Sequence, residues 1–169
     1  MKPAIRSHLL FFGGVVLVVG LDQLSKLWVV LNIPAYTPMN FIPSLAPILS
    51  FTLVQNTGVA FGLFPKFGDV FTILSAGVIV GIMIFHRLIA GTNSWVNAAL
   101  GLVAGGALGN LVDRLTRGYV VDFLDVNFWP LQEWPVFNLA DSAIVVGVAI
   151  LLVVSFLTDE KSAAPDAGM

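Results

Sequence analysis

The chain has 169 residues, of which 57% are hydrophobic and only 11% are charged, and its formal net charge is −2. In soluble domains about a quarter of the residues are charged, so this composition excludes an ordinary soluble protein and predicts an integral membrane protein. The lack of any Lys/Arg cluster excludes a nucleic-acid-binding surface, and the lack of Cys excludes disulfides, thiol nucleophiles and thiolate metal sites.

Four apolar segments predict an all-α membrane protein, because each is close to the roughly 20 residues that cross a hydrocarbon core. They cover residues 9–31, 70–85, 95–112 and 139–157, within one membrane domain of residues 1–158. Four spans place both termini on the same side. The eight basic residues divide evenly between the two sides, so the prediction that the terminal side is cytoplasmic rests on the amino-terminal pair, Lys2 and Arg6. No small-x-small cleavage site follows the first segment, so it is predicted to be retained as a helix.

The connection between the first two spans is interrupted by Pro and Gly, which excludes a spanning helix there. Residues 50–53 alternate polar and apolar, and turn residues at 55–58 precede residues 59–64, the pattern of a hairpin or curved sheet. We therefore predict a small β-rich element at residues 42–66, on the periplasmic side. The polar composition of residues 159–169 predicts a disordered cytoplasmic tail.

Three glycines spaced four apart, Gly101, Gly105 and Gly109, mark one face of the third span. Small residues at this spacing let another helix approach closely, since lipid supplies no hydrophobic drive between helices. Packing within one bundle is the preferred interpretation, and homodimerisation through this face is the alternative. We expect a monomer.

Ionisable residues inside membrane spans are costly and are candidates for function. Asp22 and Lys26, four apart on the first helix, could serve function or form a structural ion pair. A second group at the outer end of the third span could form a site or merely cap the helix; it consists of Asn110, Asp113 and Arg114.

Three further acids lie toward the same side of the membrane. Asp122 and Asp125 are three apart in an apolar stretch, so at least one is predicted to point inward, unless both are solvated loop acids. Asp141 lies just inside the fourth span, where an acid can cap a helix. Asn138 could cap that helix without a charge.

Several kinds of chemistry can be weighed for these residues. The two histidines, His8 and His86, fall at the cytoplasmic ends of spans, and no H-E-x-x-H motif occurs, which disfavours a zinc peptidase or a serine–histidine pair. Two close aspartates can share one proton, so that one polarises water while the other donates to a carbonyl, as in aspartic peptidases. A small proton- or cation-coupled transporter is the alternative, and a non-enzymatic assembly factor is a third interpretation.

Five blocks in order carry a family resemblance: "LDQLSK", "QNTGVAFG", "GGALGNLVDR", "GYVVDFLD" and "FNLADSAI". Together they resemble bacterial lipoprotein signal peptidases (signal peptidase II) over nearly the whole chain. The resemblance implies an inner-membrane peptidase that cuts diacylglyceryl-modified prolipoproteins before the lipidated cysteine, with no cofactor and no metal. It implies that Asp122 and Asp141 are the catalytic pair, which spacing alone left open. Ser25 replaces a threonine often found in the family and keeps the hydroxyl.

The resemblance and the residues together suggest supporting roles around this pair. Asn110 and Asn138 are expected to hydrogen-bond the acids or the substrate, and Asp113 and Arg114 to brace the third helix. The substrate's signal helix would pack beside the glycine-bearing span, with its lipid chains in the membrane. Asn56 and Gly58 are expected to belong to a platform over the substrate. Asp22 and Lys26 are expected to orient this platform from below.

Overall fold

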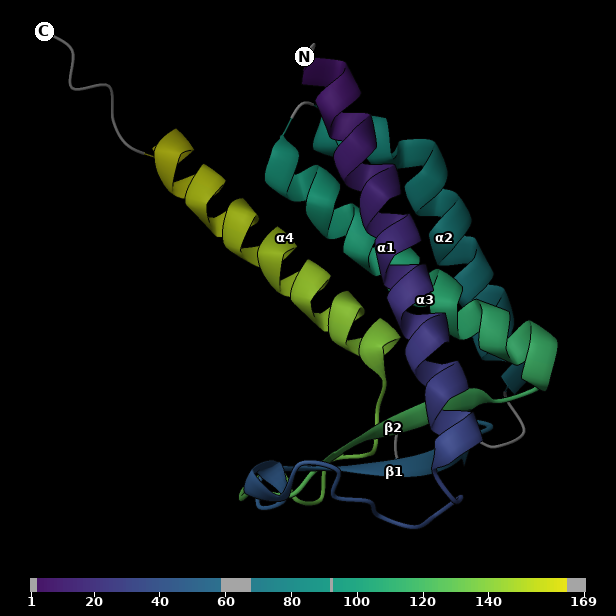
Figure 1. Cartoon of the computed structure of the whole chain (residues 1–169). Coiled ribbons are helices and arrows are strands. Elements are labelled where there is room, and N and C mark those ends of the chain that lie inside the picture. Colours follow the sequence, from purple (N-terminus) through teal and green to yellow (C-terminus); the bar gives the residue numbers. More distant parts are fainter. Residues whose placement is uncertain (1–2, 59–67, 92, 164–169) are drawn as a thin grey trace, which may run out of the picture.

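The molecule consists of a bundle of helices with a two-stranded sheet at one end (Figure 1). The computed structural model describes residues 3–58, 68–91 and 93–163. The start of α1 and the end of α4 lie at one end of the bundle, and the sheet lies at the other (Figure 1). The described elements are α1 (Pro3–Asn32), the 3-10 helix η1 (Pro43–Leu45), β1 (Leu49–Asn56), α2 (Gly68–Ala90), α3 (Ser94–Arg117), β2 (Val120–Val126) and α4 (Leu139–Ala163).

Three stretches are long and apolar enough to cross a membrane: Ile5–Asn32, Ser94–Arg117 and Leu139–Thr158. The apolar part of α2, Val70–His86, is shorter. The prediction of a mostly helical membrane protein is therefore confirmed. The prediction for the tail is wrong in part, because residues 159–163 continue α4, in agreement with the helix-forming Glu, Lys and Ala among them. The rest of that tail, residues 164–169, lies outside the described residues.

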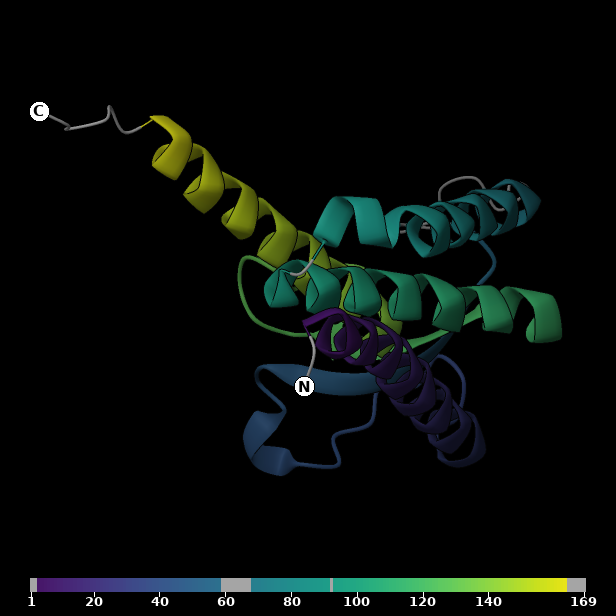
Figure 2. The same cartoon turned by 90° about the horizontal axis from the view of Figure 1, so that it is seen from above.

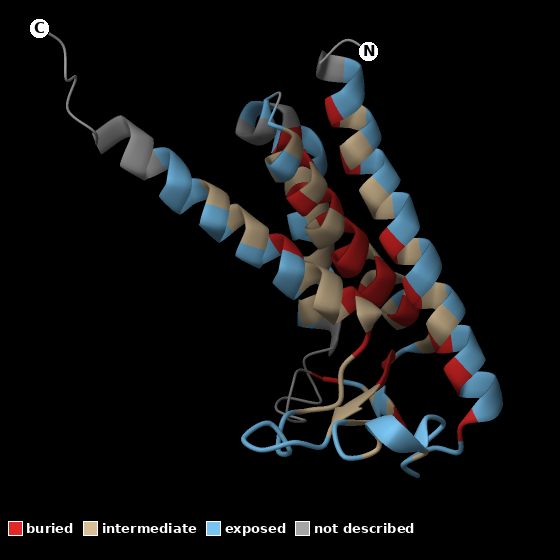
Figure 3. Cartoon of the chain, turned by 60° about the vertical axis from the view of Figure 1, so that its left-hand side comes forward, coloured by how far each residue is buried: buried red, intermediate tan, exposed pale blue. Residues whose placement is uncertain are grey.

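Helix α3 is the centre of the bundle and contacts α1, α2 and α4 (Figure 2). Buried residues concentrate on it, whereas the outward faces of α1 and α4 are largely exposed (Figure 3). Gly101 and Gly105 face α1 so closely that an added Cβ would lie 2.6 Å from Phe11 O and 2.8 Å from Val18 Cβ. The glycine face is thus used for packing within the chain, as preferred from the sequence.

The sheet differs from the predicted hairpin. Its two strands come from distant parts of the sequence, and β1 pairs antiparallel with β2, which lies in the loop between α3 and α4. The alternation of polar and apolar residues in β1 could not identify β2 as its partner. The β2 segment is an apolar run, and such a run is equally typical of a loop that lies on the membrane. Residues 59–64, predicted as the second arm of the hairpin, lie outside the described residues.

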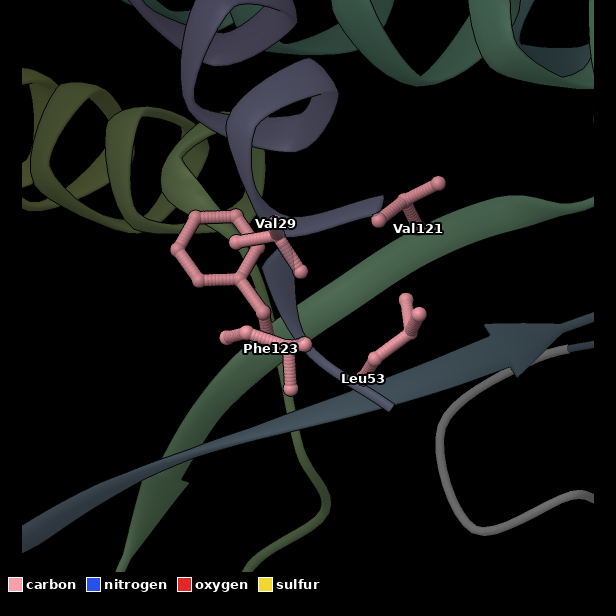
Figure 4. Close-up of a cluster of buried hydrophobic side chains, with 5 residues drawn as sticks. Val29, Leu53, Val121 and Phe123 are labelled. Carbon is pink, nitrogen blue, oxygen red and sulfur yellow. The ribbon is translucent and has the colours of Figure 1, made fainter. Parts of the chain in front are cut away.

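A small hydrophobic cluster fixes the sheet to the end of α1 (Figure 4). Leu53 of β1 and Val121 and Phe123 of β2 are at most 5% exposed and pack against Val29 and Ile33 of α1. Side chains of a strand alternate between faces, so Asp122 projects opposite to Val121 and Phe123. The hydrophobic face of β2 thereby determines the direction of its acid.

Candidate active site

The two acids chosen from the family resemblance lie on different elements but line one groove. Asp122 is on β2 and 2% exposed, and Asp141 is in the first turn of α4. The groove has a volume of about 780 Å³. Its polar lining residues are Asn56, Asn110, Arg114, Asp122, Asp141 and Ser142, and its apolar ones include Val126, Leu131, Trp134, Phe137, Val145 and Val146.

Asp141 takes part in a capping arrangement at the start of α4. The backbone N–H of Asp141 donates to Asn138 Oδ1 (3.0 Å), and the backbone N–H of Asn138 donates to Asp141 Oδ2 (3.2 Å). This reciprocal pair is a capping box, in which two otherwise unpaired N–H groups at a helix start are satisfied. The capping interpretation and the functional one are therefore compatible, because capping uses only Oδ2 and leaves Oδ1 for another contact.

Two asparagine amides connect the acids. Asn110 Nδ2 donates to Asp141 Oδ1 (2.7 Å), and Asn138 Nδ2 donates both to Asp122 Oδ1 (2.6 Å) and to Asn110 Oδ1 (3.1 Å). Asn56 Nδ2, from β1, donates to Asp122 Oδ2 (2.8 Å), while Asn56 Oδ1 accepts from the Gly58 backbone N–H (3.0 Å). Each of the four carboxyl oxygens thus accepts one N–H and keeps a lone pair for water or a proton.

The environment of Asp122 favours its protonated form. Burial is the main cause, and the neighbouring Asp141 carboxylate adds to it, so that the pKa of Asp122 rises to about 7. The hydrogen bonds from Asn56 and Asn138 and the charge of Lys26 act in the opposite direction and are outweighed. A carboxyl group that keeps its proton near neutral pH beside a second acid is the pattern of a shared-proton pair.

A fully buried ion cluster lies beneath the acids. Lys26 Nζ is 2.8 Å from Asp22 Oδ2 and 2.9 Å from Asp113 Oδ2, and all three side chains are 0% exposed. Asp22 Oδ1 accepts the backbone N–H of Ala140 (3.0 Å), and Asp113 Oδ2 accepts that of Val121 (3.1 Å). Each buried acid therefore holds the residue that immediately precedes Asp141 or Asp122.

Two members of this cluster were not predicted. Gln23 Nε2 donates to Asp22 Oδ2 (3.1 Å) and to Asp113 Oδ1 (3.2 Å), and Arg117 forms an ion pair with Asp113. Arg117 could have been found from its position four residues after Asp113 on the same helix. Gln23 is a polar side chain inside an apolar span, which is itself a signal.

The other predicted residues differ in whether they line the groove. Arg114 lines the groove, and its guanidinium donates to Asn110 O (3.4 Å). Asp125 is not among the groove residues and accepts instead from Thr52 Oγ1 (2.7 Å). Among the residues that the structure describes, no three His, Asp or Glu side chains are grouped so that they could hold a metal ion.

Comparison with known proteins identifies the family. The family described as "Signal peptidase (SPase) II" matches residues 14–157. The chain belongs to the signal peptidase II family. The "Lipoprotein signal peptidase" of Shewanella halifaxensis (strain HAW-EB4) is 42% identical, with 95% of this chain and 94% of the relative covered. That of Shewanella pealeana (strain ATCC 700345 / ANG-SQ1) is 42% identical, with 92% and 93% covered.

A solved structure supports the same assignment. A bacterial membrane enzyme determined by the in meso method at 2.3 Å resolution matches with a TM-score of 0.80 and 29% identity, covering 96% of this chain and 94% of the other. The predictions of a signal peptidase II, and thus of an aspartic-type peptidase, are confirmed. The transporter interpretation finds no support.

Proposed function

We propose that this signal peptidase II removes the signal peptide from diacylglyceryl-modified prolipoproteins by cutting before the lipidated cysteine, with Asp122 and Asp141 activating the attacking water. The observation that carries the proposal is the convergence of the two acids on one groove, each oxygen fixed by an amide N–H. Fixed donors hold both carboxyl groups without preventing either from exchanging a proton with water.

The chemistry follows from one shared proton. The ionised acid removes a proton from water as the water oxygen attacks the scissile carbonyl, and the protonated acid donates to the carbonyl oxygen. The tetrahedral intermediate collapses when the acid that took the proton from water passes it to the leaving amine of the cysteine and the C–N bond breaks. The other acid takes back a proton from the intermediate, which restores the shared proton of the pair. The raised pKa of Asp122 supports Asp122 as the acid that holds the proton at the start.

The form of the groove supports a lipidated peptide as the substrate. Its polar end holds the acids, while Val145 and Val146 at its apolar side are 66% and 51% exposed on α4, where lipid would surround them. A diacylglyceryl group could remain in the membrane along this side while the peptide bond reaches the acids. Because α1 covers the glycine face of α3, we place the signal helix against α4 rather than on that face. Asn56 and Gly58 of the sheet end would contact the extended peptide.

The same proposal includes the membrane arrangement. We place α2 as a fourth span and both termini in the cytoplasm of a bacterial cell, with the sheet and groove at the periplasmic face of the inner membrane. The location of the sheet at the end of the bundle opposite to the start of α1 is consistent with this orientation (Figure 1). The chain would act as a monomer in contact with membrane lipids.

The test compares purified variants in lipid vesicles on a diacylglyceryl-modified prolipoprotein. Asp122→Asn and Asp141→Asn should each reduce cleavage by at least about 10³-fold, since each removes one member of the proton-transferring pair. Asp125→Asn is the matched control, an acid three residues from Asp122 that does not line the groove, and should cleave like the parent. Asparagine can still accept the backbone N–H at the start of α4, so loss of cleavage by Asp141→Asn would report lost chemistry rather than a folding defect. Substantial cleavage by this variant would refute the dyad.

A further inference from the structure

Lys26 makes a third contact in addition to its two ion pairs. Besides Asp22 and Asp113, its ammonium donates to Asn110 Oδ1 at 2.9 Å. An ammonium carries three N–H donors and no acceptor, so these three contacts use its whole hydrogen-bonding capacity. The two carboxylates come from α1 and α3 and hold Nζ in place, since all three groups are fully buried.

This contact decides which way the Asn110 amide faces. Only the carboxamide oxygen can meet an ammonium, so the NH2 group must point in the other direction, where it meets Asp141 Oδ1. The oxygen also accepts from Asn138 Nδ2, which brings the Asn138 NH2 between Asn110 and Asp122. Both amides therefore present N–H groups, and not oxygens, to the two acids.

The reverse orientation would be unfavourable for the acids. A flipped Asn110 would set its carbonyl oxygen against Asp141 Oδ1, two acceptors with no proton between them, and would remove the acceptor that directs Asn138. In a buried polar network such an unpaired contact costs more than in water. Without a cation behind Asn110, the two orientations would have more similar energies.

We propose that Lys26 is a positioning residue of the peptidase, which fixes the orientations of the Asn110 and Asn138 carboxamides and through them the two acids. Its role is distinct from holding the helices together by charge. The inference rests on the proposed function, because it assigns a role in that reaction, and it requires no contact between Lys26 and the substrate.

The first test is a double-mutant cycle on kcat and KM for prolipoprotein cleavage, using the parent, Lys26→Met, Asn110→Ala and the double variant. If Lys26 acts through Asn110, Lys26→Met should lower kcat at least about 10-fold when Asn110 is present and by less than about 3-fold when it is absent, with KM little changed. Equal factors in the two backgrounds would overturn the proposal and leave a purely structural lysine. A parent that does not cleave prolipoprotein would instead refute the proposed function.

Lys26→Met leaves the buried Asp22 carboxylate without its cation, while Asp113 keeps Arg117, so a charge-balanced variant is needed in case Lys26→Met does not fold. Asp22→Asn/Lys26→Met removes one charge of each sign and leaves Asp113 paired with Arg117. In asparagine-labelled protein, we expect the side-chain NH2 protons of Asn110 to exchange with solvent at least about 10-fold faster in this variant than in Asp22→Asn, which keeps the lysine. Equal exchange rates would refute the proposal independently of any activity.

Discussion

Replacing Gly106 of α3 by alanine should damage both stability and catalysis, although Gly106 is not itself a site residue. An added Cβ would lie 2.3 Å from Ala140 O and 2.8 Å from Ile144 Cγ1, where ordinary contacts begin at 3.4 Å. Because the nearest atom belongs to the backbone of α4, no side-chain rotation relieves the contact. The start of α4 must move away from α3 by about 1 Å at this crossing.

The displaced segment includes the residue before Asp141. A shift of about 1 Å at a reacting group can cost on the order of 10²-fold in rate, so we expect kcat to fall by about that factor. Overpacking costs about 1–3 kcal/mol, and alanine returns about 1 kcal/mol of helix propensity, so the net loss should be about 0–2 kcal/mol. Each kcal/mol corresponds to roughly 2–4 °C in the unfolding midpoint of a chain of this size.

The assay measures the initial cleavage rate at saturating prolipoprotein together with thermal unfolding in the same detergent. Gly81→Ala on α2 is the matched control, since nothing lies within 4 Å of its added Cβ. We expect the control to cleave like the parent and to unfold at the same or a slightly higher temperature. If Gly106→Ala matched the control in both measurements, the argument from close packing of α3 on α4 would be wrong.

Three further predictions concern Asp122. Its pKa of about 7 predicts that the cleavage rate falls above about pH 7, when its proton is lost; a rate that stays constant to pH 9 would contradict this. Because the folded-state value lies above the ordinary 3.8, the contribution of Asp122 to stability should be fully present below about pH 4 and be lost as pH rises to about 7, and Asp122→Asn should remove this contribution from an unfolding profile. Asn56→Ala removes a hydrogen bond that lowers this pKa, so the alkaline limit of activity should move to higher pH, while kcat falls about 10-fold; an unchanged limit would show that the Asn56 contact does not influence the acid.

The sequence predicted those parts of the molecule that depend on local patterns. The apolar lengths of the helices and the close approach expected of the third span follow from composition and spacing. The structure agrees with the close approach and with three of the four predicted spans, while the apolar part of α2 is shorter. The pairing of β1 with β2 is a contact between residues 49–56 and 120–126, and no local pattern encodes it. Residue spacing likewise could not decide whether Asp122 or Asp125 points inward. They differ because the cluster around Val121 and Phe123 determines which face of β2 is turned inward.

Several residues of the supporting network could be marked from the sequence, but the contacts that connect them could not. Intramembrane polarity marked Asp22, Lys26 and Asp113 as candidates, yet the separate roles expected of them gave no indication that one ammonium joins the Asp22 and Asp113 carboxylates. Their backbone partners, Val121 and Ala140, have no polar side chain and so carry no sequence signal. Partners of this kind become visible only when three helices and a strand are placed together.

The division of the acids between a strand and a helix has a consequence for the newly synthesised protein. Asp141 lies on α4 itself, whereas Asp122 reaches its position only when β2 pairs with β1, a pairing between residues 120–126 and residues 49–56. Long-range pairings of this kind form late relative to helices. Under the mechanism proposed above, a chain with its helices inserted but its strands unpaired would hold both acids and have no hydrolytic activity. Cleavage would then begin only once β1 and β2 have paired, so strand pairing would be the last step that activates the enzyme.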